Sequence, residues 1–121
     1  MIEIVEWCQS GADVNKPNEQ GLTALMASSR NGDLKIVKLL IRYGAHINLK
    51  DHRDLSALQY ATFENNLEIV EYLVSNGADI SNGVYMTAIH KNHKEITAFF
   101  DSLDKSKQVF NTTKEYNANK I

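Results

Sequence analysis

Three glycines, Gly11, Gly44 and Gly77, stand 33 residues apart and open the related segments GADVN, GAHIN and GADIS. The last two follow apolar residues that recur at helical spacing. The apolar face before Gly44 comprises Ile36, Val37, Leu39, Leu40 and Ile41, and that before Gly77 comprises Ile69, Val70, Tyr72, Leu73 and Val74. Glycine enters the left-handed backbone region without a Cβ clash, so it commonly stands just past a helix end. The spacing therefore predicts a repeated structural unit, each copy of which ends in a helix followed by glycine.

A shorter helix is expected ahead of each of these longer ones. Thr23 and Ser56 are suitable N-caps, because a hydroxyl oxygen can accept from a free N–H group at a helix start. They precede the expected helices 24–30 and 57–64. Polar, turn-rich segments, KPNEQGL and LKDHRDL, precede the caps and are predicted to form β-turn fingers.

The two helices of each unit are expected to be joined by a tight turn. Gly32 and Asn65 are the residues there that best tolerate a positive φ. Asp33 and Asn66 follow them and are predicted to cap the second helices.

Neighbouring units are predicted to meet along one apolar seam. Leu25, Leu40, Leu58 and Leu73 are its expected members. In the second helices of neighbouring units, Lys35 and Lys38 fall one period before Glu68 and Glu71. We therefore expect opposite charges to face each other there, although exposed pairs contribute only about 0–1 kcal/mol.

These features resemble the ankyrin repeat. The resemblance rests on GLTAL at 21–25, DLSAL at 54–58 and the three glycine segments, and it covers about residues 2–100. It implies an all-α solenoid of helix-turn-helix repeats with short β-turn fingers. The sequence departs from the family pattern at Asp54, which replaces a glycine. We expect this to cost about 1 kcal/mol if φ is positive there.

The repeats predict one ankyrin repeat domain over residues 1–103. A partial unit (1–16) with a helix at 2–10 is followed by full units 17–49 and 50–81. A shortened unit (82–103) is expected to have helices at 84–91 and 95–103 and a finger reduced to 81–83. Residues 104–121 form a polar tail in sequence.

Charge and composition argue against several other classes of protein. A net charge of -2 gives no electrostatic reason to bind nucleic acid or an anionic membrane. The single cysteine, Cys8, excludes an internal disulfide and fits a reducing compartment. No apolar run approaches the roughly 20 residues that cross a bilayer, and no signal peptide is evident. We expect a cytoplasmic protein, with a nuclear location and a secreted effector left open.

The sequence contains no phosphate loop, paired-cysteine motif or serine elbow, so we expect no enzyme and no cofactor. His90 and His93 could share a metal on a helix, but no third ligand is evident, and Asn92 and His93 are expected to form a polar turn between the two helices. Cys8 is expected to pack as a small apolar group. A metal-binding or enzymatic protein remains a remote alternative.

The resemblance implies a protein–protein interaction module that binds its partner in a concave groove. A host-directed effector or adaptor using the same groove is the alternative. The predicted partner-binding residues point outward from the fingers, the first helices and the ends of the second helices: Glu19, Gln20, Leu22, Arg30, Tyr43, His52, Arg53, Leu55, Phe63 and Asn76. Arg30, Arg53, Phe63 and Tyr43 are the expected anchors, because arginine and aromatic residues dominate interface energies.

Each of these residues also has a structural interpretation. Leu22 and Leu55 could fix the finger bases, and Phe63 could pack under the shortened fourth finger. Arg30 and Arg53 could be solvated charges. A second candidate surface is the N-terminal edge, where Ile2, Ile4, Val5 and Trp7 lack a first helix to cover them. That edge could support self-association, or it could mark a fragment boundary.

Overall fold

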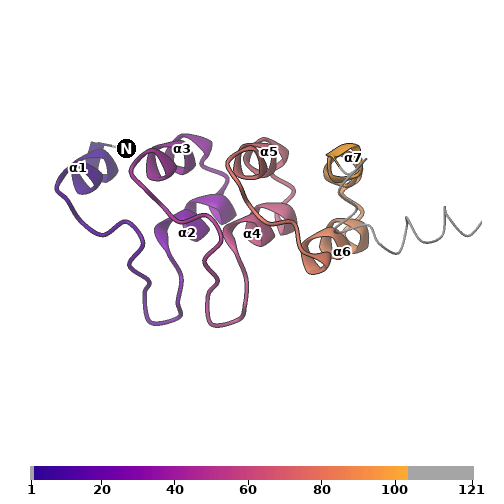
Figure 1. The fold of residues 1–121 in the computed structure, drawn as a ribbon, viewed down its shortest axis with the longest axis horizontal. Coiled ribbons are helices and arrows are strands. Elements are labelled where there is room, and N and C mark those ends of the chain that lie inside the picture. The colour runs from indigo at the N-terminus through magenta and orange to yellow at the C-terminus, as the bar shows by residue number, and fades with distance from the viewer. Residues whose placement is uncertain (1, 104–121) are drawn as a thin grey trace, which may run out of the picture.

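The computed structural model describes residues 2–103, which form helices arranged in two layers along one row (Figure 1). The helices are α1 (Ile2–Gln9), α2 (Ala24–Asn31), α3 (Leu34–Arg42), α4 (Ala57–Phe63), α5 (Leu67–Ser75), α6 (Asn82–His90) and α7 (Lys94–Leu103). One layer holds α2, α4 and α6, and the other holds α1, α3, α5 and α7. Two long loops project beyond the α2–α4 layer (Figure 1). The predicted all-α solenoid with fingers is confirmed.

The helix ends follow from the local sequence, with one exception. The side chains of Thr23, Asp33 and Ser56 accept from backbone N–H groups at 3.2–3.3 Å and cap α2, α3 and α4 as predicted. Asn66 occupies the N-cap position of α5 as predicted, but its side chain makes no capping hydrogen bond. Its Nδ2 instead donates to the Ser29 carbonyl oxygen at 3.3 Å. The predicted side-chain cap was wrong because the Asn66 amide is oriented toward a carbonyl near the end of α2, where helix carbonyls lack an intrahelical partner.

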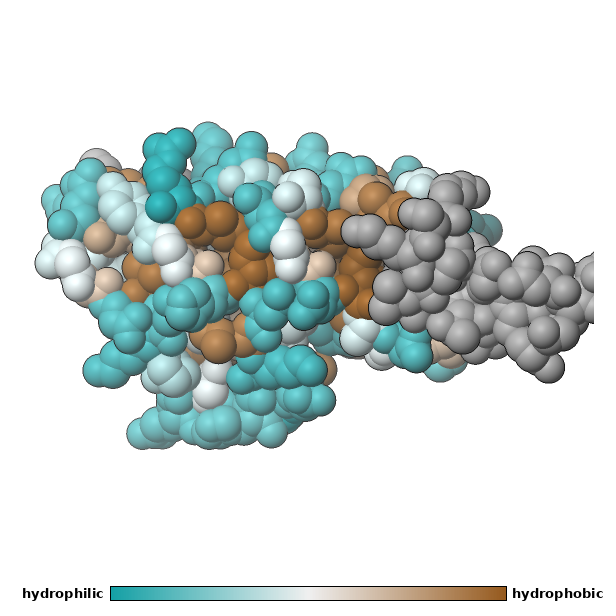
Figure 2. Space-filling model, in the orientation of Figure 1, coloured by the Kyte–Doolittle hydropathy of each residue, from teal (hydrophilic) through white to brown (hydrophobic). Residues whose placement is uncertain are grey.

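One continuous hydrophobic core runs through the stack. Leu25, Leu40, Leu58 and Leu73 are each at most 2% exposed and belong to a single cluster that reaches Ile96 and Phe100 in α7. Full burial of one such side chain stabilises the fold by about 1.5–3 kcal/mol. The predicted seam is confirmed. In Figure 2 hydrophobic surface forms a band along the row of helices, whereas the fingers are hydrophilic.

Asparagine side chains tie successive units together. Asn15 donates from Nδ2 to the Gly44 carbonyl at 3.2 Å and accepts from the His46 N–H at 2.7 Å. Asn48, one period later, bonds to Gly77 O and Asp79 N at 3.0 and 2.8 Å. Each asparagine therefore satisfies one carbonyl and one N–H of the next unit.

The last unit has no finger, contrary to the expectation of a short one at 81–83. Ser81 stands one period after Asn48, but its hydroxyl accepts from the Val84 N–H at 3.2 Å and caps α6. Asn82 and Gly83 consequently lie in the first turn of that helix. The segment read as a turn had the composition of a turn, but serine is also a strong N-cap.

The charge pairs expected between α3 and α5 do not form. In the described residues no ion pair joins Lys35 or Lys38 to Glu68 or Glu71. Lys38 Nζ lies 5.4 Å from the centroid of the Tyr72 ring instead. Exposed charges gain little from pairing when water already solvates them, so packing decides where the lysine lies. The predicted tail, 104–121, falls outside the described residues.

Candidate partner-binding groove

Two side chains at equivalent positions shape the fingers. Oδ1 of Asn18 accepts from the backbone N–H groups two and four residues later, at 2.8 and 3.0 Å. Oδ1 of Asp51 accepts from the corresponding groups of the next finger at 2.9 and 3.0 Å. These turns fix the backbone at each finger tip.

The two fingers lie side by side and touch through the backbone. The His52 N–H donates to the Gln20 carbonyl at 3.0 Å. Gly21 lies at the contact with φ +83°, and a Cβ there would come within 2.9 Å of the His52 backbone nitrogen. Asp54, at the matching position, has φ 67°, so the expected cost of about 1 kcal/mol applies.

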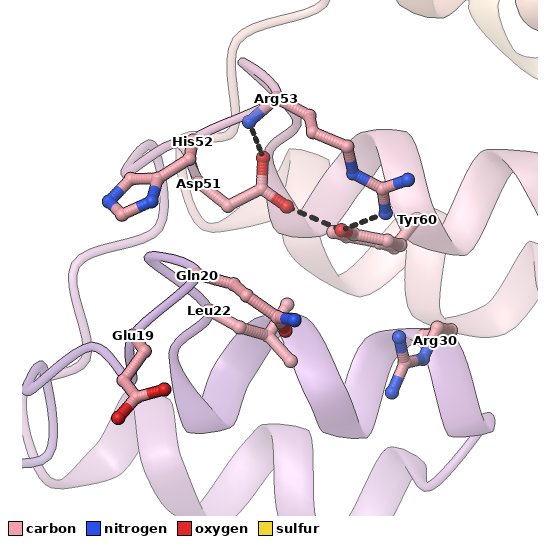
Figure 3. A pocket seen from close by; sticks show the side chains of 8 residues that line it. All are labelled: Glu19, Gln20, Leu22, Arg30, Asp51, His52, Arg53 and Tyr60. Atoms are coloured by element: carbon pink, nitrogen blue, oxygen red, sulfur yellow. Dashed lines mark hydrogen bonds between the residues drawn. The ribbon is translucent and has the colours of Figure 1, made fainter.

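A hollow of about 370 Å³ opens between the fingers and the ends of the first helices; we call it the finger hollow (Figure 3). Its lining residues are Glu19, Gln20, Leu22, Arg30, Asp51, His52, Arg53 and Tyr60. The Tyr60 hydroxyl donates to Asp51 Oδ2 and accepts from Arg53 Nη2 at 3.3 Å. The Arg30 guanidinium carbon lies 5.8 Å from the centroid of the same ring.

Asp51 is held as a buried carboxylate. It is only 8% exposed. Burial by itself raises the pKa of Asp51, but hydrogen bonds from the Tyr60 hydroxyl and two backbone N–H groups, together with the Arg53 charge, lower it below its ordinary value. The carboxylate therefore keeps its charge at neutral pH and orients the tyrosine.

A second hollow of about 520 Å³ adjoins the first and runs over α4 toward α6; we call it the helix hollow. It is lined by Arg30, Arg53, Leu55, Gln59, Tyr60, Phe63, Glu64, Thr87, His90 and Lys91. Lys91 Nζ lies 4.3 Å from the Phe63 ring centroid, a cation–π distance. Gln59 Nε2 donates to Thr87 Oγ1 at 2.7 Å and so links α4 to α6. Arg30, Arg53 and Tyr60 line both hollows, which together we call the groove.

Eight of the ten predicted partner-binding residues line the groove, and two do not. Tyr43 and Asn76 are the C-caps of α3 and α5 and line neither hollow. Leu22 and Leu55 are half-buried and pack against the core, so they also fix the finger bases as the alternative interpretation had it. Phe63 is 48% exposed, and no fourth finger exists to cover it. That these residues bind a partner stays a prediction.

Several groove residues were not predicted from the sequence. Asp51 and Tyr60 were overlooked, as were residues farther along the helix hollow: Gln59, Glu64, Thr87, His90 and Lys91. One signal was available for the first pair. Asp51 replaces the neutral Asn18 of the preceding finger, and Tyr60 replaces Ala27, so both changes occur in the same unit.

The side chains of His93 and Cys8, which could have served a metal site or a reactive thiol, are engaged in hydrogen bonding and packing. His93 Nε2 lies 3.1 Å from the Phe63 carbonyl oxygen and joins the start of α7 to the end of α4. Among the described residues no three potential metal ligands cluster. Cys8 is 5% exposed in the core, and burial raises the pKa of its thiol.

The N-terminal edge is partly covered. Ile4, Val5 and Trp7 in α1 are half-buried, and Trp7 packs against the core cluster. The side chain of Ile2 falls outside the description. Self-association through this edge stays a prediction. Within residues 2–103 the longest helix, α7, has 10 residues, and none of the helices meets the length and apolarity that a bilayer span requires.

Stacked helical pairs, fingers on one side and a groove along the first helices define a solenoid repeat protein. A family model for ankyrin repeats, with three copies, matches residues 1–84, and the chain belongs to the ankyrin repeat family. Ankyrin repeats are generally protein–protein interaction modules, and the family is typically non-catalytic. A comparison with curated proteins found no match.

Proposed function

We propose that this chain is a non-catalytic interaction module that binds a protein partner in the groove. The observation that carries the proposal is the continuity of the two hollows, which share Arg30, Arg53 and Tyr60. Arginine and aromatic side chains are the commonest energetic anchors of protein interfaces. Tyr60 and Arg53 are held in place by hydrogen bonds before any partner arrives, which lowers the entropy lost on binding.

The groove fits an interface of ordinary or small size. A stack of this length offers roughly 600–800 Å² on the partner-facing side, the lower part of the usual range. Affinity then depends on a few anchors rather than on area. Phe63 and Arg53 are the principal candidates, because both are exposed and both line the helix hollow.

The test is affinity purification from the native cell with quantitative mass spectrometry. The bait carrying Arg53→Glu and Phe63→Ala should lose at least tenfold of a specifically captured protein. Truncation of an interface anchor typically costs about 2 kcal/mol or more, which exceeds a factor of ten. Circular dichroism checks that the variant remains helical.

The matched control carries Arg42→Glu and Ile89→Ala. It makes the same kinds of change at exposed positions outside both hollows. Capture by this control should equal that by the unmodified chain. Equal capture by the groove variant and the unmodified chain would refute the proposed groove.

A further inference from the structure

We propose that the helix hollow selects an acidic peptide segment of the partner, with a carboxylate between Arg30 and Lys91 and an adjacent apolar side chain against Phe63. This inference rests on the proposed function and names the chemistry of the partner. The helix hollow is lined by three permanent cations, Arg30, Arg53 and Lys91, and by one carboxylate, Glu64.

This cationic surface contrasts with the rest of the protein. The whole chain carries a net charge of -2, so the helix hollow has the opposite sign. The finger hollow is lined by the same two arginines together with Glu19 and Asp51. Asp51 offsets part of the Arg53 charge, so Arg30 and Lys91 are the cations that remain for an anion. Complementary potentials steer partners and reject those of the wrong charge. An acidic segment is therefore favoured in the helix hollow and not along the whole groove.

The cations retain capacity to bind an anion. Within residues 2–103 none of the three forms an ion pair with a carboxylate at 4 Å or less. Arg53 uses one of its guanidinium donors on Tyr60, and a guanidinium has five N–H groups. Asp51 does not occupy the remaining donors, since its oxygens accept from Tyr60 and from two backbone N–H groups.

Aromatic rings hold two of these cations in place. Arg30 lies over the Tyr60 ring, and Lys91 lies over the Phe63 ring at 4.3 Å. A cation positioned on a ring face loses less conformational freedom when an anion arrives. The 48% exposed Phe63 also offers apolar surface beside the charges. The hollow thus combines anion donors with an apolar contact, which matches a peptide that alternates acidic and apolar residues.

The experiment measures fluorescence anisotropy of a short labelled peptide in which glutamate alternates with leucine. Three matched peptides carry glutamine, lysine or phosphoserine in place of glutamate. The full chain should bind the glutamate peptide at least tenfold more tightly than the glutamine peptide, and salt should weaken this binding. The double substitution Arg30→Gln and Lys91→Gln should raise Kd for the glutamate peptide about tenfold and leave the glutamine peptide unaffected.

The control variant Arg42→Gln with Lys35→Gln makes the same change in net charge outside both hollows. An equal loss of affinity in this control would overturn the proposal, because it would show attraction by the overall field. So would the absence of binding by the glutamate peptide, equal binding of the glutamine peptide, or tighter binding of the lysine peptide. Binding of the phosphoserine peptide alone would assign the site to a phosphate and overturn the carboxylate.

These outcomes separate the two proposals. If acidic and neutral peptides bind equally, and Phe63→Ala weakens both, the groove still binds peptides and only the preference for acid fails. The proposed function itself is judged by the capture experiment and its own control, which use no synthetic peptide.

Discussion

Asp51 performs two tasks, and Asn18 in the preceding finger performs only one of them. Asn18 makes the same pair of backbone hydrogen bonds with a neutral amide, so the turn itself does not require a charge. The negative charge of Asp51 instead acts on Tyr60, whose hydroxyl it accepts from. The tyrosine in turn accepts from Arg53. One acidic residue thus connects the finger backbone to two candidate binding side chains.

We predict that Asp51→Asn changes the dependence of stability on pH. The pKa of Asp51 is lower in the folded protein than in the unfolded chain, so its stabilising contribution is present above about pH 4 and is lost as pH falls through the folded value. At pH 7 the variant should be less stable by about 1 kcal/mol, since one hydrogen bond weakens. Urea unfolding from pH 7 to pH 3 should show a shallower decline for the variant.

Asp54→Asn provides the control for this prediction. The Asp54 side chain is 83% exposed and lies 3.7 Å from the Lys50 ammonium. Its removal should leave the pH slope unchanged, because exposed pairs contribute little. Parallel curves for the unmodified chain and Asp51→Asn would show that the buried carboxylate does not couple protonation to folding.

The helices could be predicted from the sequence because their signals are local. A cap such as Thr23 or Asp33 lies three residues from the N–H group it serves, and Gly44 follows the helix it ends. Asn66 failed because its actual partner, the Ser29 carbonyl, is 37 residues away. The prediction of a short finger at 81–83 was wrong for a different reason. Ser81 suits both a turn and a helix cap, and only packing decides between them.

We predict that Gly21→Ala destabilises the fingers beyond the cost of its backbone conformation. The added methyl would lie 2.8 Å from His52 Cδ2 and 2.9 Å from the His52 backbone nitrogen. The hydrogen bond from the His52 N–H to the Gln20 carbonyl oxygen must therefore lengthen. The strain of a positive φ costs roughly 1 kcal/mol, and the clash with backbone should add about as much again. The free energy of unfolding in urea measures the total.

Gly44→Ala separates the two contributions. Gly44 also has a positive φ, +93°, but no atom lies within 4 Å of its Cβ position. It should therefore show only the conformational cost. Equal losses in the two variants would mean that the fingers move apart without resistance. Their contact would then be too weak to shape the finger hollow.

The groove could be predicted only in outline, because it depends on how units sit against one another. The repeat offset identifies outward positions, and so Arg30, Arg53 and Phe63 were found from sequence. Lys91 belongs to the next unit, which is offset by an irregular interval, and its contact with Phe63 joins the ends of α4 and α6. A shared surface between neighbours has no signal in either neighbour alone.

We predict that Asn48→Ala weakens coupling along the whole stack. Its amide makes one hydrogen bond to Gly77 O and one to Asp79 N, both in the following unit. Loss of both should lower the free energy of unfolding by about 2 kcal/mol. We call this pair of hydrogen bonds the Asn48 clamp. Ser81, one period later, forms no such clamp, so α6 and α7 are attached to the stack only through the unit that Asn48 holds. In the variant the backbone amides of α6 and α7 should therefore exchange with solvent faster than those of α2 and α3.

Asn76→Ala is the matched control, since the Asn76 amide bonds only within its own helix end, to Tyr72 O and Ser75 Oγ. Uniformly faster exchange in all helices would instead indicate that the stack unfolds as one cooperative unit, in which this clamp has no local role.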